Sequence, residues 1–289
     1  MAALCPDFTA LTWQWRRVTS RPGRRVLQVL DTGRAAGQTR RVTRAVGRQT
    51  GHGGRGPLGW WLRLSAIVVR PVVRLMFRFR WAGQQHVPRT GGVILMANHV
   101  SKLDPFSIAR FTWDAGRIPR FLVKEGLFGV FFVGAVLRGA RQIPVRRGTN
   151  EATTALRAAE QALRDGEAVV VYPEGTVTRD PDWWPMQGKT GLARLWLATD
   201  VPVIPVAQWG QQRSWDYHTG KFRLFPRKRV VVVAGPPVDL SYFRGRPVTP
   251  EALREITDTA FSAVRDLLAV ERDEPAPDGF WLVGERTHP

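Results

Sequence analysis

The chain has 289 residues, of which 44% are hydrophobic, so it is long enough for one large domain or two small ones with a full core. Its single cysteine, Cys5, excludes an internal disulfide framework and any zinc site built from several thiolates, and it fits a reducing compartment. The net charge of +19 predicts a surface that attracts phosphates, whether on nucleic acid, on an anionic membrane or on a small substrate.

Residues 1–56 are basic and have little periodic pattern. They hold eleven arginines, no lysine and two aspartates, and only a weak apolar pattern stands out, around Val26–Leu30. We expect this tail to be mostly unstructured. It lacks the apolar core of a secretion signal, and its one serine, Ser20, is too few for a transit peptide. Two interpretations stay open: a polybasic arm for anionic lipid, or an over-extended start without selected structure.

Residues 57–80 combine tryptophans, aliphatic residues and regularly spaced arginines. On a helix, four arginines would share one stripe: Arg63, Arg70, Arg74 and Arg78. Pro71 would kink such a helix, and its longest clean apolar run, Leu64–Val69, falls far short of the roughly 18 residues that a membrane span needs. The pattern predicts an amphipathic helix in the membrane interface, with Trp60 and Trp61 at the boundary. A helix packed on its own domain is the alternative.

Short apolar runs alternate with helical stretches from Gly91 onward. The expected strands are Val93–Ala97, Phe121–Val123, Ile143–Val145, Ala168–Tyr172, Val203–Ala207 and Val230–Ala234. The expected helices are Asn150–Arg164, Thr190–Ala198 and a last helix that ends near Glu271, with Thr249 as its N-cap and Pro250 at its first position. This order predicts an α/β fold with a mostly buried mixed sheet flanked by helices, whose catalytic core spans 81–275 within a domain of 57–289.

The stretch "MANHVSKLDP" places His99 and Asp104 five residues apart, directly after the first of these strands. An isolated pair at this spacing is usually a pair of polar loop residues. Asp104 would lie in the first turn of a helix capped by Ser101, so that its carboxylate could fold back toward the imidazole. The later blocks of the chain decide whether the pair has a function.

Three later stretches also carry polar groups at strand ends: "RQIPVRRG" (141–148), "VYPEGTVTRD" (171–180) and "VPVIPVA" (201–207). Together with "NHVSKLD", in this order, they resemble the glycerolipid acyltransferase family, the lysophosphatidic acid acyltransferases in particular. "GKTGLARL" is similar to the family's K-x-G helix start. The resemblance covers roughly Trp60 to Leu268. The chain departs from the family after Thr176, where Val177-Thr178 replaces a frequent Arg-Ser and Arg179 follows.

The resemblance implies transfer of a fatty acyl group from a thioester to the sn-2 hydroxyl of 1-acyl-glycerol-3-phosphate. His99 would take the hydroxyl proton and Asp104 would orient the imidazole and balance its charge. Because no nucleophile motif such as G-x-S-x-G occurs, we expect direct attack without an acyl-enzyme. The acyl donor, acyl-CoA or acyl carrier protein, is a co-substrate. No cofactor and no metal are implied.

The resemblance also implies where the substrate binds. Arg147, at the end of a strand, matches the arginine that would hold the phosphate bidentately, whereas Arg146 beside it is expected to face the other way. The remaining substrate-binding candidates are Glu174, Gly175, Thr176, Lys124 and Lys189. Glu174 would organise the basic residues or a substrate hydroxyl rather than bind a metal.

The uncharged run Leu127–Leu137 is too short to span a bilayer. It is most simply a core segment; the alternative is that it lines an acyl channel or dips into the membrane. The expected partners are an acyl thioester, lysophosphatidic acid and an anionic membrane surface, without specific nucleic acid, at the cytoplasmic face of the cell membrane. Two alternative functions stay open: acylation of another lysophospholipid or of a glycolipid, and a non-catalytic basic protein that binds membrane or nucleic acid.

Overall fold

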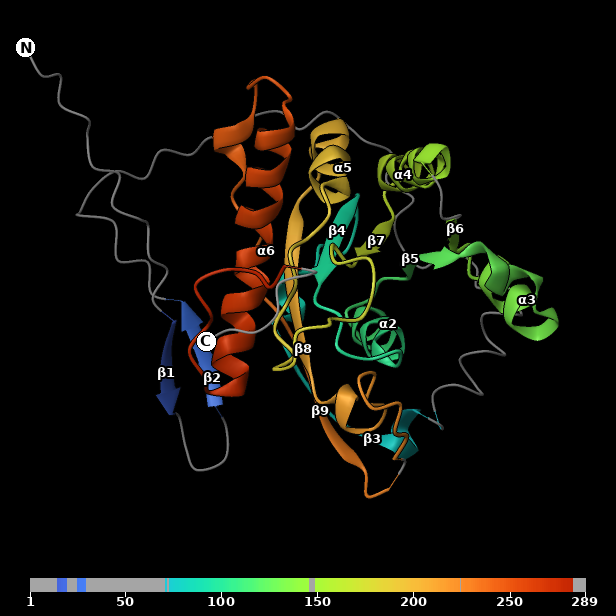
Figure 1. The fold of residues 1–289 in the computed structure, drawn as a ribbon, viewed down its shortest axis with the longest axis vertical. Coiled ribbons are helices and arrows are strands. Elements are labelled where there is room, and N and C mark those ends of the chain that lie inside the picture. Colours follow the sequence, from blue (N-terminus) through green and yellow to red (C-terminus); the bar gives the residue numbers. More distant parts are fainter. Residues whose placement is uncertain are drawn as a thin grey trace, which may run out of the picture. The chain divides into compact units, whose positions relative to one another are not determined.

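The computed structural model describes residues 15–19, 25–29, 71, 73–145, 149–223 and 225–282 (Figure 1). The chain divides into two compact units, Met1–Gln49 and Thr50–Pro289. In the first unit, β1 (Trp15–Thr19) pairs antiparallel with β2 (Arg25–Val29). Within residues 1–56 these two short strands are an exception to the expected lack of structure, and the prediction that the tail is mostly unstructured stays a prediction. The weak apolar pattern near Val26 belongs to β2, and the rest of the tail lies outside the described residues.

The second unit is built on a seven-stranded mixed sheet in the order β3-β9-β8-β4-β7-β5-β6. Its strands are β3 (Phe77–Ala82), β4 (Val93–Ala97), β5 (Pro119–Lys124), β6 (Ile143–Val145), β7 (Ala168–Val171), β8 (Val203–Trp209) and β9 (Lys228–Ala234). The neighbouring strands pair in parallel except β8 and β9, which pair antiparallel. The predicted fold class and the six predicted strands are confirmed.

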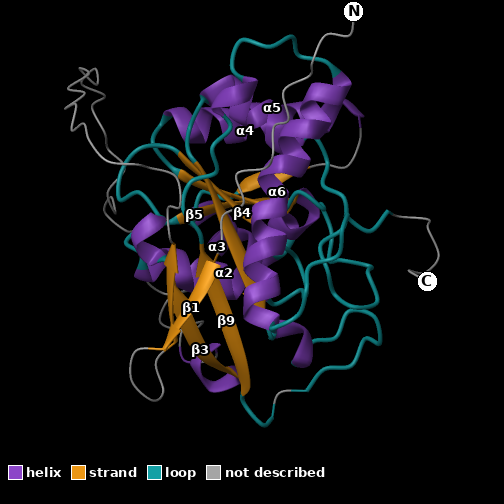
Figure 2. Ribbon diagram, turned by 90° about the vertical axis from the view of Figure 1, so that its left-hand side faces the viewer, coloured by secondary structure: helices purple, strands orange, loops and turns teal. Residues whose placement is uncertain are grey.

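Besides a short helical stretch at residues 73–76, this unit has five described α-helices: α2 (Asp104–Asp114), α3 (Phe131–Gly139), α4 (Thr149–Arg164), α5 (Gly191–Thr199) and α6 (Pro250–Arg272). Figure 1 shows α2 and α6 on opposite sides of the central strands, and helices cover both faces of the sheet (Figure 2). The expected cap of α6 is present, because the Thr249 hydroxyl accepts a hydrogen bond from the Ala252 N–H at 3.2 Å.

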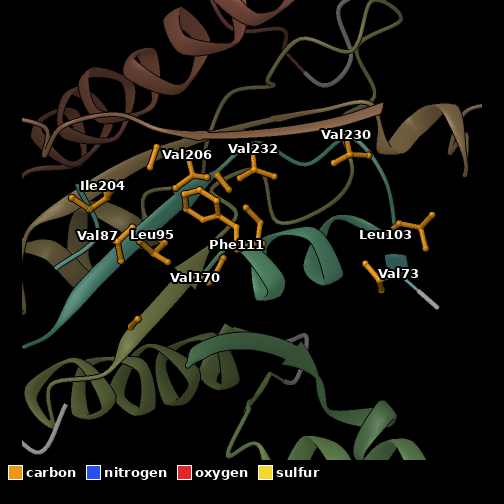
Figure 3. Close-up of a cluster of buried hydrophobic side chains, with 14 of the residues drawn as sticks. Val73, Val87, Leu95, Leu103, Phe111, Val170, Ile204, Val206, Val230 and Val232 are labelled. Carbon is orange, nitrogen blue, oxygen red and sulfur yellow. The ribbon is translucent and has the colours of Figure 1, made fainter. Parts of the chain in front are cut away.

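The core between α2 and the sheet is made of branched aliphatic side chains around one aromatic ring. Phe111 of α2 points toward the sheet, where Leu95, Val206 and Val232 are fully or almost fully buried (Figure 3). β4 is buried at all five positions, as expected for a central strand covered on both faces. This packing fixes the carboxyl end of β4, from which the NHVSKLD block extends.

The predicted helix over 57–80 is wrong at its end. Residues 57–70, with Arg63 and Arg70, lie outside the described residues; residues 73–76 are helical, but residues 77–82 form β3, which pairs with β9. Arg74 and Arg78 satisfy helical spacing, yet the segment FRFRWA also alternates aromatic and polar residues, as a strand does. Pairing with β9 and burial of Phe77 favour the strand. No helix in the described ranges is long and apolar enough to cross a membrane.

Candidate active site

Asn98 joins the end of β4 to β8. Its Nδ2 donates to the Gln208 carbonyl at 3.0 Å, and its Oδ1 accepts from the Gln208 N–H at 2.9 Å. The Gln208 side chain returns a third bond to the Asn98 carbonyl at 2.7 Å. Both side chains are buried, so these bonds form in a setting of low dielectric constant. Asn98 thereby fixes the backbone that leads into His99.

His99 and Asp104 form a hydrogen-bonded pair, as the sequence predicts. The His99 Nδ1 lies 2.8 Å from the Asp104 Oδ2. Since a carboxylate oxygen accepts, this contact favours the tautomer with the proton on Nδ1 and leaves the lone pair on Nε2. The imidazole is partly exposed, whereas Asp104 is fully buried. An imidazole held in this way is suited to take a proton from a hydroxyl group.

Backbone N–H groups of the loop before α2 donate hydrogen bonds to a single oxygen of Asp104. Oδ2 also accepts from the backbone N–H groups of Val100, at 2.6 Å, and Ser101, at 2.9 Å. Burial raises the pKa of Asp104, while the hydrogen bond and charge of His99 and the two N–H groups lower it. The prediction that Ser101 is the N-cap of this helix is wrong. The helix begins at Asp104 after Leu103, and the Ser101 hydroxyl accepts from Leu103 N–H and donates to the Trp215 carbonyl.

Tyr172 supports the face of the imidazole. Its ring stacks on that of His99 with centroids 4.4 Å apart and planes inclined by 23°. Burial raises the pKa of the Tyr172 hydroxyl well above its usual range, and the charge of Asp104 adds to this. A stacked aromatic ring and the Asp104 hydrogen bond constrain the imidazole from two directions. Tyr172 was not among the predicted site residues; its position immediately before Pro-Glu-Gly-Thr was the only sequence clue.

Glu174 connects two backbone segments next to the pair. Its Oε1 accepts from the His99 N–H at 2.9 Å and its Oε2 accepts from the Met186 N–H at 3.0 Å. Burial raises the pKa of Glu174 to about 8, and the N–H groups of Met186 and His99 act in the opposite direction. Both carboxylate oxygens are thus used inside the protein. These contacts favour a role for Glu174 in positioning the backbone of His99, and its role in binding substrate stays a prediction.

Gly175, Thr176 and Lys189 lie together after β7. Gly175 has a φ of +71°, which a glycine adopts without strain, and the Lys189 Nζ is 3.1 Å from where a Cβ on Gly175 would be. The Lys189 N–H donates to the Pro173 carbonyl at 2.8 Å, while its side chain is exposed and Thr176 is half-buried. The structure therefore places one exposed ammonium group over the turn that carries Glu174.

The other predicted basic residues are placed differently. Lys124 is exposed at the end of β5. Arg146 and Arg147 lie outside the described residues, directly after β6. Arg179, in the block that departs from the family pattern, is exposed, while the N–H of neighbouring Thr178 donates to the His99 carbonyl at 2.7 Å.

A groove of about 640 Å³ is lined in part by Pro105, the residue that follows Asp104, although neither His99 nor Asp104 lines it. Lys102 of the loop before α2 also lines it, together with side chains of α2, β5 and α3. Apart from Lys102, Arg110 and Lys124, its lining side chains are uncharged and mostly apolar. The interpretation of Leu127–Leu137 as a core segment is wrong, because several of its side chains are exposed and others line this groove.

Comparison with known proteins agrees with this geometry. Residues 78–209 match the family model described as Acyltransferase. These residues form an acyltransferase domain. The match contains the His99–Asp104 pair, Glu174 and every groove-lining residue except Val73, and the family resemblance predicted from the motifs is confirmed. Within the part of the domain that the structure describes, no group of three or more metal-binding side chains occurs.

Three relatives illustrate the range of the family. This chain is 29% identical over 150 residues to the 1-acyl-sn-glycerol-3-phosphate acyltransferase of Borreliella burgdorferi, a match that covers 50% of this chain and 58% of that protein. It is 26% identical over 215 residues to the lyso-ornithine lipid O-acyltransferase of Rhodobacter capsulatus, covering 68% and 74%. The fold is similar to that of the lysophosphatidic acid acyltransferase PlsC from Thermotoga maritima, with a TM-score of 0.55 and 23% identity over 74% of this chain and 84% of that one.

Glu174→Gln tests the positioning role. A glutamine amide would direct its NH₂ group at one of the two backbone N–H groups, leaving a buried donor unpaired at a cost of about 1–3 kcal/mol. We expect a lower free energy of unfolding and a lower kcat with an unchanged KM for the acceptor. Because the pKa is raised in the folded protein, Glu174 stabilises it fully below pH 4.5, and this contribution is lost as the pH rises through about 8.

Chemical denaturation across this pH range and steady-state kinetics give the answer. The Gln variant should lose part of the pH dependence of stability. Glu255→Gln, a change at an exposed glutamate of α6, serves as the matched control. A raised KM for the acceptor together with an unchanged free energy of unfolding would show that Glu174 binds substrate.

Proposed function

We propose that the acyltransferase domain moves a fatty acyl group from an acyl thioester to the sn-2 hydroxyl of 1-acyl-glycerol-3-phosphate. The observation that carries the proposal is the buried Asp104 carboxylate 2.8 Å from the His99 Nδ1, beside an apolar groove. The acyl donor is acyl-CoA or acyl carrier protein, acting as co-substrate. No resident cofactor takes part. The site acts at the cytoplasmic face of the cell membrane.

The reaction follows from the state of the imidazole. The His99 Nε2 takes the hydroxyl proton as the oxygen attacks the thioester carbonyl carbon, and the C–O bond forms. The resulting imidazolium is balanced by Asp104. When the tetrahedral intermediate collapses, the C–S bond breaks, and the imidazolium returns the proton to the thiolate sulfur. No acyl-enzyme is needed, because the acceptor oxygen attacks the thioester directly.

The groove supports the use of a long acyl chain. A chain of about sixteen carbons needs an apolar path, and each CH₂ removed from water contributes about 0.8 kcal/mol. The groove is lined by Pro105, which follows Asp104 in the chain, by Phe121 of β5 and by Phe132 of α3. A thioester carbonyl near His99 would therefore have its hydrocarbon directed away from the polar loop and into this groove.

The acceptor headgroup requires cations near the same strand ends. Lys189 is exposed over Gly175, and Arg147 follows β6 two residues after its end. A phosphomonoester carries nearly two negative charges and is matched by an arginine fork. A specific observation keeps a second acceptor in view: the relative from Rhodobacter capsulatus is named for a lyso-ornithine lipid. The alternative function is therefore acylation of another lysolipid by the same pair.

Purified protein assayed with a panel of acceptors and both donors tests the proposal. Lysophosphatidic acid should be acylated at sn-2 with the highest kcat/KM, and product analysis by mass spectrometry should show phosphatidic acid. A preference for lyso-ornithine lipid or for another lysophospholipid would move the proposal to that acceptor. Absence of acyl transfer to every acceptor, with both donors, would contradict it.

Arg147→Ala tests the phosphate contact. Removing a charge-assisted fork should raise the KM for a phosphate-bearing acceptor by about 10-fold or more, while the KM for the acyl donor changes little. The measurement is steady-state kinetics with each substrate varied in turn. Arg146→Ala, predicted to face away, is the matched control. Equal effects on both KM values, or none, would show that Arg147 does not hold the phosphate.

A further inference from the structure

The segment that joins β5 to β6 carries an exposed apolar surface. It comprises η2 (Glu125–Gly129) and α3, and its exposed side chains are Leu127, Val130, Phe131, Phe132 and Val133, which we call the α3 apolar surface. Phe131 is 93% exposed. Large apolar side chains that stay in contact with water do not stabilise the folded domain. Patches that hold several of them in one short stretch usually mark a binding surface.

Charge at the borders of this surface indicates what it binds. No charged residue occurs from Gly126 to Leu137, and the flanking residues are cationic apart from Glu125: Lys124, Arg138 and Arg141. Arg138 donates to the Phe128 carbonyl at 2.6 Å and stays exposed, and Arg141 lies 3.5 Å from Glu167 with most of its side chain exposed. An apolar centre with cationic borders is complementary to a bilayer that has anionic headgroups.

The same surface is continuous with the groove. Leu127, Phe132 and Val133 are exposed and also line the groove that begins at Pro105. The apolar lining therefore connects the exposed face of α3 with Pro105, the residue that follows Asp104. An acyl chain could move from a bilayer into this groove without crossing water. α3 has nine residues, too few to span a membrane, so it would lie in the interface.

We propose that the α3 apolar surface inserts into one leaflet of an anionic bilayer, with Phe131 deepest, so that the groove opens at the level of the acyl chains. The proposal rests on the proposed function for the identity of the lipid that enters. Insertion itself requires no turnover. A lipid surface is favoured over a protein partner because the cationic border matches headgroups and the groove matches acyl chains.

Spin labelling measures insertion directly. The protein has one native cysteine, so a Cys5→Ser background allows a nitroxide to be attached at a single new cysteine. Phe131→Cys is the test position, and Val248→Cys, also exposed but before α6, is the matched control. Power saturation with oxygen and with a water-soluble nickel complex is recorded with and without vesicles of phosphatidylcholine and phosphatidylglycerol.

We expect the label at position 131 to be mobile and accessible to nickel without vesicles. On addition of vesicles it should become accessible to oxygen and shielded from nickel, whereas the label at 248 should not change. A label at 131 that stays accessible to nickel with vesicles, including a protein that does not bind them, overturns the proposal. A label that is immobile and shielded without vesicles also overturns it, because another part of this chain or a second copy then covers the surface.

A double variant adds a functional readout. Val130→Ser/Phe131→Ser, at two exposed positions that do not line the groove, should lower the affinity for these vesicles by about 100-fold, since two large apolar side chains no longer leave water on binding. Val248→Ser is the control. Acylation of an acceptor in vesicles should fall, while that of a short-chain soluble acceptor should persist. Insertion without acyl transfer would reject the proposed function alone, and acyl transfer without insertion would reject only the surface.

Discussion

Replacing His99 by alanine should lower kcat by about 10²-fold or more while leaving the fold and lipid binding intact. In the proposed mechanism the imidazole takes the acceptor proton, and its Nδ1 is already held 2.8 Å from Asp104. Alanine removes the base and leaves water as the only proton acceptor. The measurement is a single-turnover assay with saturating acyl donor and acceptor, so that product release does not mask the chemical step.

His86→Ala is the matched control for this experiment. His86 belongs to η1 (Gln84–His86), before β4, and it is half-buried like His99. The control should keep normal turnover, and circular dichroism should show native structure in both variants. A His99→Ala protein with near-normal single-turnover rates would remove general-base catalysis by this residue, whatever the acceptor lipid is.

The sheet was largely predictable because its inner strands are continuous apolar runs. Each of the six predicted strands is found with ends within two residues of the prediction. β3 was missed for a physical reason: Arg74 and Arg78 fit a helical stripe, and only pairing with β9 and burial of Phe77 select the extended form. A truncation that tests membrane contact must therefore end before residue 73, since removal through Arg80 would also remove most of an edge strand.

The His99–Asp104 contact was predictable from the sequence, but the residues that position the pair were not. The NHVSKLD block identifies His99 and Asp104, since their spacing lets one loop bring both side chains together. The contacts of Glu174 could not be predicted from the sequence, because its partners are backbone N–H groups, which have no sequence signature. Stacking of Tyr172 on His99 depends on how β7 lies beside β4, and only the folded sheet sets that geometry.

The exposure of the apolar run at α3 could not be predicted from the sequence either. Leu127–Leu137 has the composition of a core segment, and composition alone cannot say whether another element covers it. In the structure, only Gly134 among the residues of α3 is buried. The apolar character of the run is thus better explained by the groove and by a lipid surface than by the domain's own core.

Asp104→Asn and Asp104→Ala should have different effects, because all donors to this carboxylate meet at one oxygen. Val100 N–H, Ser101 N–H and the His99 Nδ1 all lie within 2.9 Å of Oδ2. Oδ1 is buried and has no hydrogen-bond partner within the described ranges. An asparagine can therefore place its oxygen where Oδ2 lies and keep the Nδ1–H tautomer, at the cost of an unpaired buried NH₂ group.

The asparagine variant then isolates the charge of the carboxylate. Its kcat should fall by about 10²-fold, because the imidazolium formed during attack is no longer balanced by a buried anion. The alanine variant should lose at least as much activity, and its free energy of unfolding should fall by about 1–3 kcal/mol for each backbone N–H group left without an acceptor. Chemical denaturation and single-turnover rates measure the two effects separately.

The double variants complete the test. If His99 and Asp104 act as one unit, Asp104→Asn should reduce turnover strongly in the wild-type background and hardly at all in the His99→Ala background. Asp114→Asn, at the other end of α2, is the control for loss of a carboxylate on the same helix. Wild-type turnover in Asp104→Asn would show that orientation alone suffices. Equal losses in both backgrounds would show that Asp104 acts through the fold and not through the imidazole.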